Sequence, residues 1–157
     1  MKKLSILLLI LSYGIMTYAA NDDLGKMSQE QRNEYLIKLS KKVIIIFGPG
    51  YYRENSIPII SDYKKFQASG TSPEEVKCTG REYYTVTFPY DKTKECLDFD
   101  FAARVDIWKD TGEPMEVLFG NGYGRNFFSL SFEEQTANNA IIETVPYRQV
   151  QKIKKEW

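Results

Sequence analysis

The feature that most constrains the fold is the stretch from Leu97 to Lys109, in which apolar and polar residues alternate. Its odd-numbered positions are apolar, namely Leu97, Phe99, Phe101, Ala103, Val105 and Ile107. The positions between them are largely polar. Because successive side chains of a strand point to opposite faces, this pattern predicts one long strand with a buried inner face and an outer face.

Two turn signals place strands on the C-terminal side of this stretch. Asp110-Thr111-Gly112 matches a three-residue hairpin loop, which pairs Ala103 with Phe119, Val105 with Val117 and Ile107 with Met115. Asn121-Gly122 is the strongest signal for a two-residue hairpin. It pairs Gly120 with Tyr123, Met115 with Phe128 and Leu118 with Arg125, and the strand continues through Leu130 and Phe132.

A further alternating stretch precedes it, with Tyr84, Val86 and Phe88 at alternate positions. A four-residue loop from Asp91 to Lys94 would pair these residues with Phe101, Phe99 and Leu97 respectively. All three turn assignments bury the same face, which a one-residue slip in any of them would spoil. The register therefore predicts that Phe101 is buried against Tyr84.

The N-terminal third predicts a helix. Ser28 and Gln31 form a capping box, and an apolar stripe runs from Tyr35 to Phe47 before Gly48-Pro49-Gly50 ends the helix. The β-branched run from Val43 to Ile46 makes a short strand the alternative for the last turn.

The remaining stretches are less constrained. Ile57 to Ile60 is compatible with a short edge strand and Ser61 to Gln67 with one or two helical turns, followed by a loop over 69–73. Near the C-terminus, Ile141 to Val145 is compatible with a fifth strand of the meander. The residues after Pro146 fit either a helix or a strand.

These elements predict an α+β domain, with an N-terminal helix packed on the inner face of an antiparallel meander of four to five strands. The outline is similar to cystatin-like folds and to the cone-shaped folds of nuclear-transport-factor type, as an analogy of architecture only.

Residues 1–20 have the layout of a secretory signal peptide, with Lys2 and Lys3, an apolar run and a small-residue end at Ala20. The expected mature domain is 21–157, secreted or periplasmic, and no other stretch is apolar enough to insert stably in a membrane. Removing Lys2 and Lys3 leaves 19 basic and 21 acidic residues. This balance gives no reason to expect a nucleic-acid partner.

The sequence contains no histidine, which removes the commonest general base and most zinc sites. Asp98, Asp100 and Asp106 share the outer face, but such a row is usually a solvated strand surface. Gly120 to Gly124 fits a hairpin better than a phosphate-binding loop, because no helix is predicted after it. We therefore expect no enzyme activity, no metal site and no cofactor.

The chain has two cysteines, Cys78 and Cys96. A secreted protein normally oxidises such a pair. The predicted register instead separates them and points them to opposite faces, which argues against a bridge.

The outer face is the candidate site. The predicted register stacks Tyr83, Ala102, Gly120 and Tyr123 in one row and Arg81, Arg104, Leu118 and Arg125 in the next, with Trp108 further along. Aromatic rings beside guanidinium groups suit sugars, carboxylates or peptides, and they also anchor protein interfaces. The candidate ligand-binding residues are Tyr83, Arg104, Trp108, Tyr123 and Arg125.

The sequence thus predicts a non-catalytic binding or accessory domain whose partner is a glycan, a peptide or a protein. Two alternatives remain. The C-terminal segment could cover the outer face as a second core, or a concave pocket between helix and sheet could hold a small ligand, with weak acid-base chemistry that needs no histidine.

Overall fold

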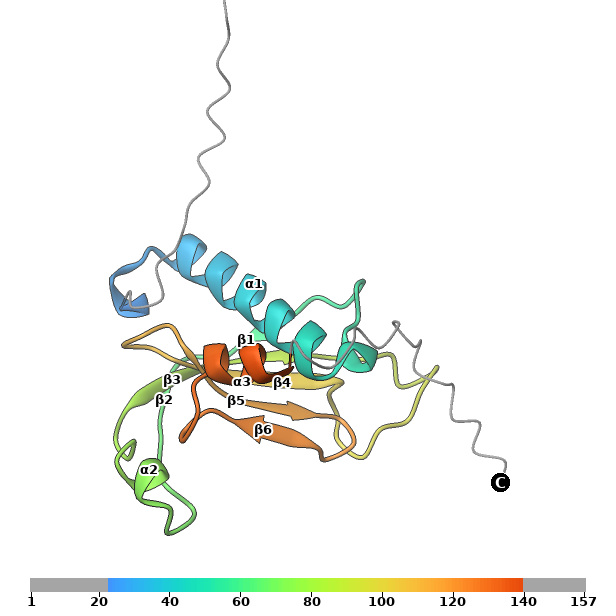
Figure 1. The fold of residues 1–157 in the computed structure, drawn as a ribbon. Helices are drawn as coiled ribbons and strands as arrows, with labels where there is room; N and C mark the ends of the chain where they lie inside the picture. Colours follow the sequence, from blue (N-terminus) through green and yellow to red (C-terminus); the bar gives the residue numbers. More distant parts are fainter. Residues whose placement is uncertain (1–22, 140–157) are drawn as a thin grey trace, which may run out of the picture.

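The computed structural model describes residues 23–139 and shows an α+β fold (Figure 1). One main helix, α1 (Gln29–Phe47), crosses an antiparallel sheet that is not closed into a barrel. The strands are β1 (Ile59–Ile60), β2 (Lys64–Lys65), β3 (Glu82–Phe88), β4 (Ala103–Trp108), β5 (Pro114–Phe119) and β6 (Gly124–Asn126). Their order is β1-β3-β4-β5-β6, and β2 also pairs with β3.

Four short helices complete the described part of the chain. They are the 3-10 turns η1 (Leu24–Lys26) and η2 (Pro49–Tyr51), α2 (Pro73–Val76) and α3 (Phe132–Asn139). The expected signal peptide, the fifth strand over Ile141 to Val145 and the ambiguous end of the chain lie outside the described residues.

Helix α1 begins and ends where the sequence predicts. The Ser28 hydroxyl accepts a hydrogen bond from the Gln31 amide, and the Gln31 side chain accepts one from the Ser28 amide, both at 3.3 Å. Val43 to Ile46 is helical, so the alternative of a strand there is wrong. Gly48 ends the helix, and a Cβ at this position would overlap the Phe119 ring, so the chain can turn here only without a side chain.

The main core lies between α1 and the inner face of the sheet. The helix contributes Leu36, Val43 and Ile44, which are fully buried. The inner face contributes Tyr84, Val86, Phe88, Ala103, Val105, Ile107, Val117 and Phe119. Helix α3 extends this core, because Phe132 packs edge-on against Phe47 and Phe127.

One buried polar atom in this core lacks a partner. Ser40 of α1 is fully buried, and in the described part of the chain its hydroxyl makes no hydrogen bond. Ser40→Ala should raise the free energy of unfolding by about 1 kcal/mol, because a buried unsatisfied hydroxyl is destabilising and alanine favours the helix. Thermal melts can check this. Ser56→Ala is the control and should lower stability, since the Ser56 hydroxyl donates to the Pro89 carbonyl at 2.8 Å; lower stability for Ser40→Ala would contradict the expectation.

The β4–β5 hairpin confirms the register predicted from Asp110-Thr111-Gly112. Ala103 lies opposite Phe119, Arg104 opposite Leu118 and Val105 opposite Val117. Gly112 has a φ of +68°, which the predicted loop requires. A bulge after Asp106 then places Ile107 opposite Pro114 rather than Met115.

The predicted register between β3 and β4 is wrong. Phe88 lies opposite Ala103 and Tyr84 opposite Ile107, a shift of six residues from the prediction. A turn does form at Asp91, where the Lys94 amide donates to its carbonyl at 2.9 Å, but β4 begins only at Ala103. Because an even shift preserves the alternation, the faces are right although the partners are not.

Two consequences follow for the predicted long strand. Residues 98–102 form bends rather than a strand. Phe101 is buried as expected, at 6% exposure. Its contact is a stacked Phe99 ring at 5.3 Å, however, and not Tyr84.

The predicted register between β5 and β6 is wrong by one residue. Val117 lies opposite Arg125 and Leu118 opposite Gly124. The turn uses three residues, Gly120 to Gly122, closed by a hydrogen bond from the Gly122 amide to the Phe119 carbonyl at 2.9 Å. Gly122 has a φ of +83°. This slip exchanges the two faces of β6.

Of the predicted short elements, one forms as expected and two do not. Ile59–Ile60 forms the expected edge strand, whereas Ser61 to Gln67 contains β2 and no helical turn. Phe132 begins α3 instead of extending a strand. Cys78 and Cys96 are both free thiols and form no disulfide.

Candidate functional site

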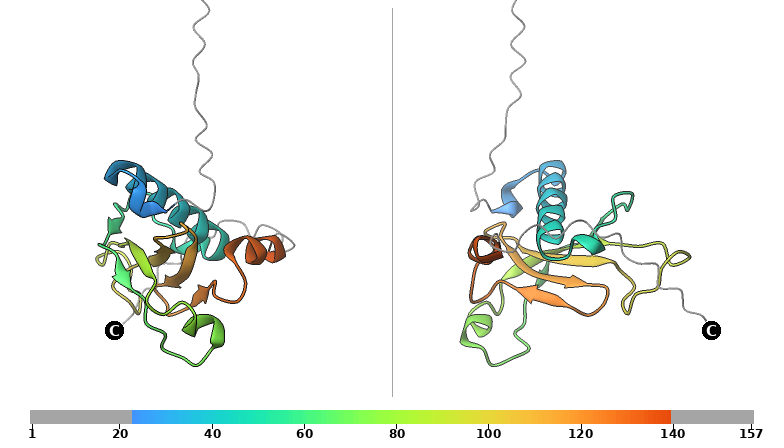
Figure 2. Two further views of the ribbon diagram at one scale, coloured as in Figure 1. Left: turned by 90° about the vertical axis from the view of Figure 1, so that its left-hand side faces the viewer. Right: turned by 45° about the vertical axis from the view of Figure 1, so that its right-hand side comes forward.

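The outer face is the side of the sheet opposite α1, and residues 23–139 cover only part of it. The segment that carries α2 lies on this side, at one end of the sheet (Figures 1 and 2). The side chains of the central strands that point to this side are Tyr83, Thr85, Thr87, Arg104, Asp106, Trp108, Glu116 and Leu118.

The covered end is a small aromatic core. The Phe66 ring lies 5.6 Å from Trp108 and 5.3 Å from Phe128, and it also contacts the edge of Tyr83. The Arg81 guanidinium lies over Trp108 at 4.0 Å and forms two hydrogen bonds with Asp110. Phe66, Arg81 and Phe128 therefore bury Trp108. The alternative that the C-terminal segment covers the outer face concerns residues 140–157, which lie outside the described residues.

The open part of the outer face centres on Arg104. Its Nε atom lies 3.9 Å from Asp106 Oδ2, and one terminal nitrogen lies 3.8 Å from Glu116 Oε1. Both distances exceed those of hydrogen bonds, and within residues 23–139 the guanidinium makes none. The side chain is 35% exposed, so its donors are accessible from solvent.

The two carboxylates lie directly opposite each other on β4 and β5. Burial raises the pKa of the Asp106 carboxyl, and the Thr85 hydroxyl, which donates to it at 2.7 Å, only partly counteracts this. The pKa of Glu116 is raised by its burial and further by the Asp106 charge. Burial also raises the pKa of Tyr83, and Asp106 adds to the shift. Both carboxyl groups therefore bind protons more tightly than exposed ones.

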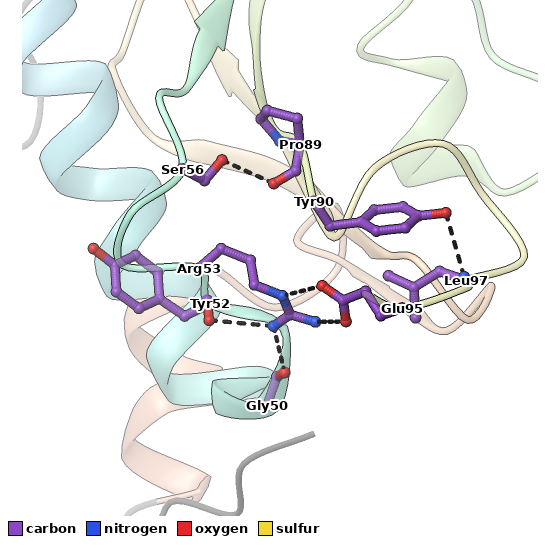
Figure 3. A network of polar contacts seen from close by, with 8 residues as sticks. All are labelled: Gly50, Tyr52, Arg53, Ser56, Pro89, Tyr90, Glu95 and Leu97. Atoms are coloured by element: carbon purple, nitrogen blue, oxygen red, sulfur yellow. Dashed lines mark hydrogen bonds and ion pairs between the residues drawn. The ribbon is translucent and has the colours of Figure 1, made fainter. Parts of the chain in front are cut away.

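A loop over residues 89–102 borders the open part, and Figure 3 shows how it is held. The Arg53 guanidinium forms two hydrogen bonds with Glu95, at 2.7 and 2.6 Å, and donates also to the Gly50 carbonyl at 2.8 Å. Beyond this anchor, the buried Phe101 ring lies 5.6 Å from the Arg104 guanidinium. Phe99 stacks on Phe101 and is 42% exposed.

The structure separates the five predicted ligand-binding residues. Tyr83, Arg104 and Trp108 lie on the outer face, but only Arg104 belongs to its open part. Tyr123 lies beside the β5–β6 turn and is 76% exposed. It lies opposite Phe119, so it belongs to the side of the sheet that faces α1. Arg125 lies over the Phe47 ring at 5.2 Å, on the α1 side.

The predicted rows are therefore wrong. Arg104 and Arg125 lie on opposite faces, because the one-residue slip turns Arg125 inward. Tyr83 lies opposite Trp108 instead of Ala102, and Arg81 is held at the aromatic core. Ala102 and Gly120 are buried and form no trough.

Sequence reasoning missed Phe99 as a surface residue. Its alternation with Phe101 predicted burial, and no signal marks the bends that expose it. The opposition of Asp106 and Glu116, in contrast, follows directly from the Asp110-Thr111-Gly112 hairpin.

Other candidate chemistry has little support in the part of the chain described. Asp98 and Asp100 are exposed in the loop rather than aligned with Asp106. No group of three or more acidic or sulfur ligands suited to a metal occurs among residues 23–139. An open pocket of about 200 Å³ is lined by Asp23, Glu82, Lys109 and Asp110, but Lys109 already pairs with Glu82 at 2.6 Å. Over the same residues, no helix has the length and apolar character needed to cross a bilayer.

Comparison with known proteins found no matching family model, no matching curated protein and no matching solved structure. The chemistry of the outer face is therefore the basis for a functional assignment. It offers guanidinium donors, carboxylate acceptors and an aromatic border.

Proposed function

We propose that this chain is a non-catalytic binding or accessory domain that works outside the cytoplasm and contacts its ligand through the open outer face around Arg104. The single observation that carries this is the half-exposed Arg104 guanidinium, which makes no hydrogen bond within the described residues. A guanidinium has five N–H donors, so one that makes no hydrogen bond within the protein can donate to a bound ligand. The signal-peptide pattern of residues 1–20 supports a secreted or periplasmic location.

The distribution of carboxylates favours the outer face over a concave pocket. The inner-face residues of β3 to β5 are apolar, and α1 packs on them with Leu36, Val43 and Ile44. The buried Asp106 and the half-buried Glu116 lie on the opposite side. The outer face is thus where the sheet presents partly exposed charged groups, Arg104 and Glu116, to solvent.

Arg104→Ala and its matched control Arg125→Ala test this proposal. The mature chain is applied to printed arrays of defined glycans and of synthetic peptides, and wild type should retain at least one probe. Arg104→Ala should lose at least about tenfold in affinity, which is the scale of one charge-assisted hydrogen-bonded group. Arg125→Ala should stay within about twofold, because Arg125 lies on the other side of the sheet.

Circular dichroism and a thermal melt establish that both variants fold. Retention of no probe by wild type would refute the proposal. Equal retention by wild type and Arg104→Ala, or a larger loss for Arg125→Ala, would also refute the role given to the outer face.

A further inference from the structure

We infer that the ligand of the open outer face is a neutral saccharide, in which a hydroxyl group bridges the Arg104 guanidinium and the Glu116 carboxylate while a sugar ring lies against Phe99. This inference rests on the proposed function and adds the chemical class of the ligand.

The charge of the site argues against an anionic ligand. One guanidinium faces two carboxylates at 3.9 and 3.8 Å. When all three groups are ionised, the cluster carries one net negative charge. Further charges of both signs lie around the cluster. The positive charge of Lys64 lowers the pKa of Asp106, and the negative charge of Glu75 raises the pKa of Glu116. A sulfate or carboxylate approaching Arg104 would therefore also approach two like charges.

The spacing of these groups suits hydroxyl groups. A hydroxyl both donates and accepts hydrogen bonds. Its oxygen can therefore accept from an Arg104 nitrogen and donate to the neighbouring carboxylate oxygen. The gap of 3.8 Å between Arg104 and Glu116, whose side chains are both about one-third exposed, is too long for a direct hydrogen bond and leaves a position from which one oxygen reaches both. A neighbouring hydroxyl of the same sugar ring can accept a hydrogen bond from a second nitrogen of the Arg104 guanidinium. Asp106 is buried and contributes its charge to the site.

The aromatic border supplies an apolar surface beside these polar groups. Phe101 is buried under Arg104 and stacks on Phe99, whose ring is 42% exposed. A pyranose ring has one face of C–H groups, which packs on a flat aromatic ring. The buried Phe101 fixes Phe99 in place, so little side-chain entropy is lost on binding.

The position of the site in the sheet argues against a peptide strand as ligand. Arg104 and Asp106 belong to β4, which lies between β3 and β5. Peptides that bind to sheets usually add to an edge strand and use its free backbone groups. The backbone of β4 is paired on both sides, so only side chains are offered at this site.

The experiment uses the mature wild-type chain and isothermal titration with two sets of probes. The first contains neutral hexasaccharides of glucose, mannose, galactose and xylose. The second contains a hexagalacturonate, a sulfated hexasaccharide and unstructured peptides. At least one neutral probe should bind, and its affinity should change less than about twofold between 0.05 and about 0.5 M NaCl, because no net charge is neutralised.

Four variants locate the binding. Phe99→Ala and Arg104→Ala should each weaken the neutral probe by about tenfold or more. Tyr63→Ala, which removes a similarly exposed ring at the Lys109 end of the sheet, should leave it within twofold. Arg104→Lys keeps the charge and removes the planar fork, so it should also weaken binding and serves if Arg104→Ala does not fold.

The outcomes separate this inference from the proposed function. Binding only of charged sugars or of peptides, lost in Arg104→Ala, would overturn the saccharide inference and leave the proposed function intact. Neutral-sugar binding that Phe99→Ala leaves unchanged would overturn the placement of the ring. No Arg104-dependent binding of any probe would overturn both.

Discussion

Gly120→Ala is expected to lower the free energy of unfolding by about 3 kcal/mol. A Cβ at this position would overlap the backbone carbonyl of Phe101 and lie 2.6 Å from a Leu97 methyl group. The carbonyl cannot move away, because the Phe99 amide donates to the Gly120 carbonyl and the Gly120 amide donates to Ala102, at 3.0 and 2.8 Å. Overpacking typically costs about 1–3 kcal/mol, and we expect the upper end here because the clash is with hydrogen-bonded backbone. Urea titration followed by circular dichroism measures the change.

Gly25→Ala is the control for the glycine substitution itself. Its Cβ would meet only the flexible ends of Asp23 and Lys109, both at 3.0 Å, so the expected change is within about 1 kcal/mol. A Gly120→Ala protein as stable as Gly25→Ala would show that the loop over 89–102 does not lie against β5 as described.

Glu95→Ala is expected to lower the free energy of unfolding by about 2 kcal/mol. The substitution leaves the Arg53 guanidinium, whose side chain is 19% exposed, without its two carboxylate acceptors. Breaking a fully buried pair costs more, and the residual exposure of both side chains reduces the effect here. Chemical denaturation of Glu95→Ala, Arg53→Ala and the double variant gives the coupling energy of the pair.

Asp91→Ala is the matched control in the same loop. Asp91 pairs with Lys94 at 2.9 Å and accepts two hydrogen bonds from Thr93, but all these contacts are exposed to solvent, so its loss should lower stability clearly less than the loss of Glu95. If Glu95→Ala and Asp91→Ala behave alike, or if the double-variant cycle shows no coupling, the Arg53–Glu95 pair does not anchor the loop.

The sheet shows which part of a register follows from sequence. The Asp110-Thr111-Gly112 turn fixed the β4–β5 register from Ala103 to Asp106. Next to the turn the pairing differs from the prediction, because the Trp108 amide donates to the Glu113 carbonyl at 2.8 Å. Alternation alone could not fix β3 against β4, since a shift of six residues keeps every side chain on its face. At β6, Phe127 and Phe128 are adjacent, so either register buries one of them: Phe127 lies in the main core and Phe128 in the aromatic core.

The site was predictable only where it depends on the β4–β5 hairpin. That hairpin places Arg104, Asp106 and Glu116 together on the outer face. The loss of Arg125 from the site follows from the β6 slip, and the burial of Trp108 follows from Phe66, whose stretch carries no clear pattern. Long-range contacts of this kind depend on tertiary packing, which local periodicity does not encode.

The loop over 89–102 also has an entropic consequence. The chain closes fourteen residues between β3 and β4, but only the five residues 109–113 between β4 and β5. Chain statistics make the longer closure less favourable by about 1 kcal/mol. The contacts of Glu95 with Arg53, of Pro89 with Ser56 and of Phe99 with Gly120 hold the loop at three points. Each contact shortens the stretch of unconstrained chain in the loop. Together they offset the conformational entropy that such a long connection would otherwise retain.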